Sequence, residues 1–351
     1  MNKERLFYAD LLRVFATFAV MLLHIGASNW YSVNVTSYEW QVFNVYDSLV
    51  RFCVPIFVML SGMFFLEPNK QITIKNIYIK YILRIVTAYV FWSALYVILN
   101  NFVFNKAEIN DDTIKNILSQ FTEGNYHLWF LFMIIGLYIV TPFIRKFVEN
   151  SDKKLLEYFM ILCILFAILI PTLSNFPYFE GLKRYIDKFY INLVLGYSGY
   201  FITGYYFKTF KISRLKQIFI YIGGIIGVIC TFAITNDLSV SQGSANEVLY
   251  GFLTPNVMLV SIAVFVFFKE IISKIKFNKG TIKIISLISY CSFGMYLVHV
   301  VFNTIFSKIG FTTLSFNPII SVPVITGSVF ICSFLVSFII SKIPFINKYI
   351  M

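Results

Sequence analysis

The sequence predicts an all-α integral membrane protein with about ten transmembrane helices. Of its 351 residues, 58% are hydrophobic and 13% are charged, which is about half the charged fraction of an ordinary soluble domain. The mean hydropathy is +0.77. Apolar runs of about 20 residues, the length that crosses a bilayer, recur along the whole chain. Together these observations predict a multi-pass protein whose length is taken up by membrane spans.

The apolar runs place the spanning helices in order along the chain. The first run follows MNKER but is longer than the apolar part of a signal peptide and lacks a clear small-residue cleavage site, so we expect a retained span. The ten spans are expected at 7–27, 45–66, 78–101, 128–148, 155–173, 189–207, 216–234, 248–268, 284–306 and 319–341.

The basic residues alternate between the loops that connect these spans. Of the 29 lysines and arginines, 21 fall on the side that also holds both termini, and six fall in the opposite loops. The positive-inside rule therefore places both termini in the cytoplasm. The net charge of +12 then reflects cytoplasmic loops and not nucleic-acid binding. We expect one transmembrane domain over residues 1–351, without a further soluble domain.

The five cysteines all lie within apolar runs and form no closely spaced pair. They are typical of small packing residues and indicate neither a disulfide framework nor a metal site.

The first span carries two ionisable residues on one face. Arg13 and His24 are eleven positions apart, which is about 20° past three full turns and roughly 16 Å along the helix axis. Ionisable groups inside a span are costly and indicate function by default. Alternatively, each side chain reaches to its nearer interface. That interpretation suits either residue alone better than it suits the pair.

The predicted topology groups further polar residues on the cytoplasmic side. Arg13 and Ser61 lie in the inner halves of their spans, and Lys80 and Arg84 lie at the inner end of the third span. Clustered cations suit a phosphate-bearing ligand, because a guanidinium group pairs bidentately with phosphate. Alternatively, Lys80 and Arg84 are anchors that contact lipid phosphates.

The three histidines of the chain, His24, His127 and His299, all fall toward the outer side, and Arg51 joins the same level. Histidine is the common general base near neutral pH. His127 could instead be an interfacial residue beside the aromatic-belt residue Trp129.

The acidic residues argue against one class of function. Asp10 and Asp47 are expected near the ends of their spans, with no carboxylate in the middle of any span. Proton- and cation-coupled transporters usually place carboxylates at mid-membrane. The pattern therefore disfavours a transporter.

Four motifs in order carry a family resemblance across nearly the whole chain. The chain resembles membrane-bound acyltransferase family 3, closest to its short branch of surface-polysaccharide O-acetyltransferases of the enterobacterial common antigen type. The motifs are Asp10-x-x-Arg13 followed, after ten intervening residues, by His24, then PIFVMLSGMFF after Arg51, HLWFL from His127, and SFGMYLVH ending at His299.

The resemblance implies a function, a set of ligands and a location. Family members move an acyl group from cytoplasmic acyl-CoA to a hydroxyl of a glycan or glycolipid on the far side of the bilayer. The implied co-substrate is acetyl-CoA or another acyl-CoA, such as succinyl-CoA, with no bound cofactor or metal. The implied location is the bacterial cytoplasmic membrane.

The resemblance also implies roles for single residues. His24 is the implied catalytic base, with Arg13 and Asp10 as its partners. The family's Arg-x-x-Arg pair at the start of the third helix reads Tyr81 and Arg84 here, with Lys80 one place early. The implied donor site is Arg13, Ser61, Lys80 and Arg84, and the implied acceptor site is Arg51, His127, Trp129, Tyr296 and His299.

Two other classes of function stay open at this point. One is a transporter or exporter of a small polar solute or glycan precursor. The other is a structural membrane subunit that recruits partners, in which His24 and Arg13 would tolerate replacement.

Overall fold

The computed structural model describes residues 6–105, 110–179, 181, 188, 196–344 and 346–351. Within these residues the secondary structure is helical and includes no strand, which confirms the predicted all-α membrane fold. The α-helices are α1 (Phe7–Gly26), α2 (Tyr38–Val50), α3 (Cys53–Phe65), α4 (Ile74–Asn76), α5 (Leu83–Ile98), α6 (Asp111–Glu123), α7 (Trp129–Glu149), α8 (Lys153–Leu162), α9 (Ile170–Leu173), α12 (Ser198–Thr209), α13 (Arg214–Gln242), α14 (Pro255–Glu270), α15 (Lys279–Lys308), α16 (Pro318–Ser341) and α17 (Ile346–Ile350).

Within the described ranges, nine helical segments are long and apolar enough to cross a membrane, and each corresponds to a predicted span. The first prediction, 7–27, matches Phe7–Asn29, and the last, 319–341, matches Pro318–Ser341. The sixth predicted span, 189–207, starts in residues 189–195, which lie outside the described residues. Its described part is α12, which is buried from Ser198 to Phe207.

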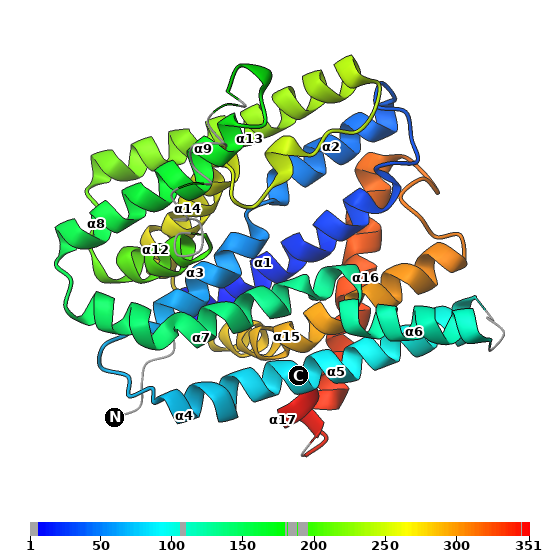
Figure 1. Cartoon of the computed structure of the whole chain (residues 1–351), viewed down its shortest axis with the longest axis horizontal. Coiled ribbons are helices and arrows are strands. Elements are labelled where there is room, and N and C mark those ends of the chain that lie inside the picture. The colour runs from blue at the N-terminus through cyan, green and yellow to red at the C-terminus, as the bar shows by residue number, and fades with distance from the viewer. Residues whose placement is uncertain (1–5, 106–109, 180, 182–187, 189–195, 345) are drawn as a thin grey trace.

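Helix α1 lies in the middle of the bundle, and α13 lies along one edge (Figure 1). Helix α1 packs against α2, α3, α14, α15 and α16. The most apolar window of α1 is 61% buried, whereas that of α13 is 22% buried. The span that carries Arg13 and His24 is therefore an inner helix, and the exposed apolar side chains of α13 suit contact with lipid tails.

The second span bends at Arg51, where α2 ends and α3 begins two residues later. Pro55 has no N–H, and its ring clashes with the carbonyl of the residue four positions earlier, which is Arg51. The span also begins at Tyr38 and not at the predicted residue 45. Our placement of Asp47 near a span end is therefore wrong: the residue is in the last turn of α2, well inside the span Tyr38–Phe65, and is 1% exposed.

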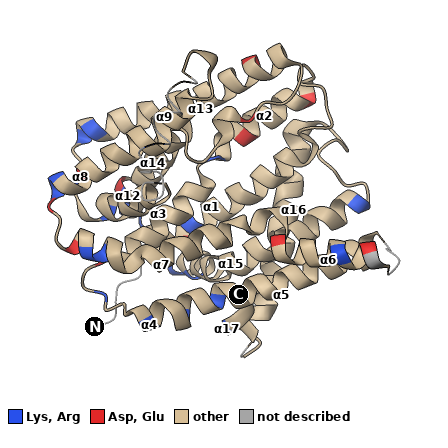
Figure 2. Cartoon of the chain, in the orientation of Figure 1, with Lys and Arg blue, Asp and Glu red and all other residues tan. Residues whose placement is uncertain are grey.

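Charged residues lie mostly at the ends of the helices, and many of the basic ones gather around α4, α7 and α8 (Figure 2). The prediction that both termini are cytoplasmic rests on this distribution of the basic residues. The orientation itself stays a prediction.

Candidate active site

A cavity of about 790 Å³ runs beside α1 inside the bundle. Arg13 and His24 both line it, which confirms that they share one face of the helix. Since the helix rises about 1.5 Å per residue, the cavity connects two points roughly 16 Å apart. Its volume is within the range of small-molecule sites, about 300–1,000 Å³.

One part of the cavity is built around Arg13. Its Nη1 donates a hydrogen bond to Oγ of Ser289 at 3.3 Å. The Ser289 hydroxyl in turn donates to Oδ1 of Asp10 at 2.7 Å. Asp10 is 6% exposed and lies behind the residues that line the cavity. Its carboxylate therefore acts on Arg13 through Ser289, a residue that the sequence analysis missed.

Arg84 and Ser61 line the same part of the cavity. Nε of Arg84 donates to the main-chain oxygen of Met351 at 2.5 Å, and its guanidinium carbon lies 5.6 Å from the centre of the Phe293 ring. Two guanidinium groups, from α1 and α5, thus face one space.

Lys80 is exposed and is not among the residues that line the cavity. Its Nζ lies 5.7 Å from the centre of the neighbouring Tyr81 ring. The segment Ile77–Ile82 is π-helical, and its i→i+5 hydrogen bonds widen the turn. Lys80 and Arg84 are thus not brought together at the cavity.

The three histidine rings, from α1, from the 3₁₀ turn Tyr126–Leu128 just before α7 and from α15, form one cluster. His24 and His127 line the cavity, while His299 is 1% exposed and lies behind them. The ring centre of His299 is 5.2 Å from that of His24 and 5.1 Å from that of His127. The three histidines, which the sequence placed at a similar depth in the membrane, thus lie side by side. The position of His299 behind the other two does not support direct contact with an acceptor.

Tyr296 lines the cavity, and its hydroxyl donates to the carbonyl oxygen of His127. The hydroxyl hydrogen of Tyr296, a residue of the implied acceptor site, is therefore bonded to the protein's own backbone. Trp129 also lines the cavity and stacks on Phe252 with ring centres 5.8 Å apart, so its indole forms part of an aromatic wall.

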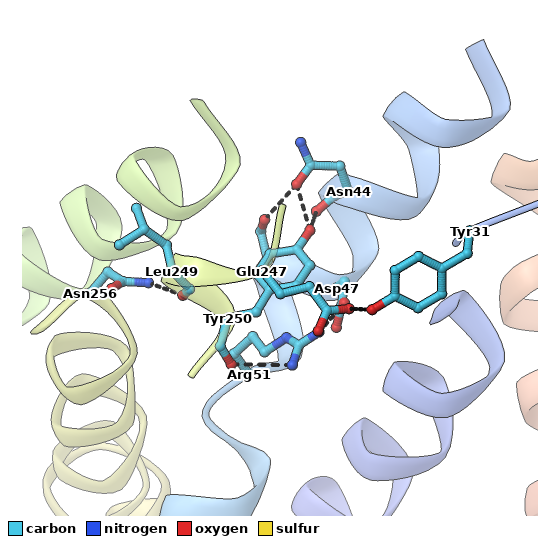
Figure 3. Close-up of polar contacts among 9 residues, drawn as sticks. Tyr31, Asn44, Asp47, Arg51, Glu247, Leu249, Tyr250 and Asn256 are labelled. Atoms are coloured by element: carbon cyan, nitrogen blue, oxygen red, sulfur yellow. Dashed lines mark hydrogen bonds and ion pairs between the residues drawn. The ribbon is translucent and has the colours of Figure 1, made fainter. Parts of the chain in front are cut away.

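Arg51 is held against the cavity wall by three contacts (Figure 3). It forms an ion pair with the buried carboxylate of Asp47. Its Nη1 donates to the carbonyl oxygen of Tyr250 at 3.2 Å, and its guanidinium carbon lies 4.0 Å from the centre of the Tyr250 ring. Tyr250 is itself anchored, because its hydroxyl bonds Oδ1 of Asn44 at 2.6 Å. The positive charge is therefore fixed in position before any ligand binds.

Glu247 lines the cavity near Arg51 and was missed by the sequence analysis. The Tyr31 hydroxyl donates to its Oε1 at 2.6 Å (Figure 3). This hydrogen bond raises the pKa of Tyr31 to about 12. The sequence does offer one indication of Glu247: it is a carboxylate that immediately precedes the eighth predicted span, on the side opposite the basic loops.

The arrangement suits an anionic ligand at one end of the cavity and proton transfer at the other. Guanidinium groups bind phosphate strongly, and a half-buried imidazole such as that of His24 can act as a general base. Within the described part of the chain, no cluster of three or more His, Cys, Asp or Glu side chains could hold a metal ion.

Comparisons with known proteins give one match. No curated protein and no solved structure matches the chain. A family model for an acyltransferase domain matches residues 6–342, nearly the whole chain. With the cavity inside an all-helical membrane bundle, this match shows that the chain belongs to acyltransferase family 3.

Proposed function

We propose that this acyltransferase moves an acetyl group from cytoplasmic acetyl-CoA to a hydroxyl of a cell-surface glycan or its lipid-linked precursor. The observation that carries the proposal is the cavity along α1, which has guanidinium groups at one end and histidines at the other. A reaction between a cytoplasmic donor and an outer acceptor needs such a path through the membrane.

The donor is expected at the end that holds Arg13 and Arg84. Their guanidinium groups would bind the phosphates of CoA bidentately, and Ser61 lines the wall between the helices that carry them. The pantetheine arm would then lie along α1. It is long enough to cover the roughly 16 Å from Arg13 to His24.

The chemistry is expected at His24. Its imidazole removes the proton from the acceptor hydroxyl while the hydroxyl oxygen attacks the thioester carbonyl. The new C–O bond forms, the C–S bond breaks, and the CoA thiolate leaves with the proton that His24 took up. General-base catalysis of this kind contributes about 10²–10⁴ in rate.

The acceptor is expected at the opposite end of the cavity, between Arg51, His127 and Trp129. A flat aromatic wall and a fixed guanidinium group suit a sugar ring with its hydroxyls. The carboxylate of Glu247 adds an acceptor for hydroxyl protons in the same space.

The test is transfer of label from radioactive acetyl-CoA to glycolipid in proteoliposomes. Wild type should transfer label, and His24→Ala should lower the rate by about 10²–10⁴. Arg13→Ala should raise the KM for acetyl-CoA. A matched control is Val14→Ala, which changes a residue of the same helix that does not line the cavity.

Succinyl-CoA in place of acetyl-CoA tests the acyl group. Transfer from succinyl-CoA alone would correct the proposed donor. Equal activity in His24→Ala, or no transfer from either donor by wild type, would refute the proposal.

A further inference from the structure

The two fully buried histidines are hydrogen-bonded through one ring nitrogen each. Nδ1 of His299 lies 2.6 Å from the carbonyl oxygen of Tyr296, and Nδ1 of His127 lies 3.3 Å from the amide oxygen Oδ1 of Asn125. The backbone carbonyl oxygen of Tyr296 can only accept a hydrogen bond, so Nδ1 of His299 carries the proton. A buried imidazolium without a counter-ion is costly, so the His299 ring is neutral and its Nε2 presents a lone pair.

This lone pair lacks a partner in the described part of the structure, where Nε2 of His299 is buried without a hydrogen bond. Since buried polar atoms in proteins are nearly always satisfied, a donor is expected beside it.

The donor that the structure offers to His299 is His24. Their ring centres are 5.2 Å apart. Two imidazoles joined by an N–H···N bond of about 3 Å have centres about 5 Å apart. In the described part of the structure the ring of His24 has no hydrogen bond, and it lines the cavity. The separation of the two ring centres is therefore the one that such a bond requires.

We propose that Nε2 of His299 accepts a hydrogen bond from His24 and so fixes the tautomer of the base. The other nitrogen of His24 then always presents its lone pair to the cavity. When that nitrogen takes up a proton, the imidazolium keeps its bond to His299. His299 is thus a positioning residue, and its catalytic consequence rests on the proposed function of His24.

Two substitutions of His299 separate this role from packing. His299→Asn keeps an amide donor near the position of Nδ1, so the bond to the Tyr296 carbonyl can persist, but it removes the acceptor at the position of Nε2. His299→Gln places an amide oxygen near the position of Nε2 and keeps that acceptor. The pair is therefore matched for polarity and differs in the feature that the proposal needs.

The first readout is nuclear magnetic resonance of protein labelled with ring-¹⁵N histidine and purified without a histidine tag. The chain has three histidines, and His24→Ala assigns the first of them. We expect one fixed neutral tautomer for His24 in wild type and in His299→Gln, and two exchanging tautomers in His299→Asn. Exchange in wild type would overturn the proposal, even if the variants did not fold.

The second readout is acyl transfer, with wild type and His24→Ala in parallel. His299→Asn should lower kcat at least tenfold with an unchanged KM for acetyl-CoA, and His299→Gln should stay within about threefold of wild type. Equal losses in both variants, or none in His299→Asn, would overturn the proposal. Absence of transfer by wild type together with a fixed His24 tautomer would instead refute the proposed function alone.

Discussion

Helices α3 and α12 approach each other so closely that a single methyl group should separate them. A Cβ atom built on Gly62 overlaps the carbonyl group of Phe201, and one built on Gly204 overlaps the carbonyl group of Met59. Both obstacles are backbone atoms, which cannot rotate away as a side chain can. Small residues permit this kind of close helix contact in membrane proteins. The substitution Gly62→Ala therefore tests whether the contact exists.

The expected loss follows from the displacement. To relieve the overlap the two helices must move apart by roughly 1 Å, and such a gap forfeits about a quarter to a half of the dispersion energy of the contacts that it opens. Adding a methylene-sized group to a packed core costs about 1–3 kcal/mol. Because the clash is with backbone, we expect about 3 kcal/mol, which lowers the Tm by roughly 5 °C in a chain of this size.

The assay is thermal unfolding of the purified protein in detergent, followed by circular dichroism. The matched control is Gly327→Ala in α16, where a Cβ atom meets nothing within 4 Å. The control should unfold close to wild type. If Gly62→Ala unfolded within about 1 °C of the control, the close approach of α3 and α12, and the reasoning from it, would be wrong.

Three further predictions concern the cavity and the residues that support it. Arg84→Ala should raise the KM for acetyl-CoA about 10- to 100-fold, since it removes a charge-assisted hydrogen bond, whereas Lys80→Ala, outside the cavity, should change it less than twofold; equal effects would contradict this assignment. Asp47→Ala should lower the free energy of unfolding, measured with a chemical denaturant, by about 3–5 kcal/mol, because Arg51 then keeps a buried charge without its partner. The double variant with Arg51→Met should recover much of this loss. An unchanged stability of Asp47→Ala would contradict the buried ion pair. Ser289→Ala should raise the KM for acetyl-CoA severalfold at unchanged kcat, since it removes the hydroxyl that links Asp10 to Arg13. An unchanged KM, measured by initial rates, would show that this link does not contribute to donor binding.

The membrane spans followed from the sequence because burial in lipid requires long apolar runs, and such runs are a local property of the chain. The second span shows the limit of this argument. Asn44 and Asp47 lower its local hydropathy, yet they lie inside α2. Asn44 donates to the carbonyl of Phe232 at 3.1 Å, and Asp47 pairs with Arg51. Hydropathy counts such side chains as costs because it ignores their partners, whether one turn away, as Arg51 is, or on another helix, as Phe232 is.

The candidate site likewise contains residues that the sequence could place and residues that it could not. The helical period placed Arg13 and His24 on one face, and both line the cavity. Lys80 was grouped with Arg84 by its place at the inner end of the third span, but its side chain is exposed and does not line the cavity. Glu247 was missed because a carboxylate in a loop carries no periodic signal. Its place beside the cavity depends on how the loops fold over the helices.

By itself, the sequence determined the fold class, nearly all of the spans, the polar face of α1 and the family resemblance. Each of these depends on short stretches of the chain or on the period of a single helix. The tertiary structure alone decided which of the three histidines face the cavity and that His299 lies behind the other two. It also decided that the Tyr250 ring packs on the guanidinium group of Arg51. These choices depend on how the helices pack and rotate against one another, and that packing brings together side chains more than a hundred residues apart.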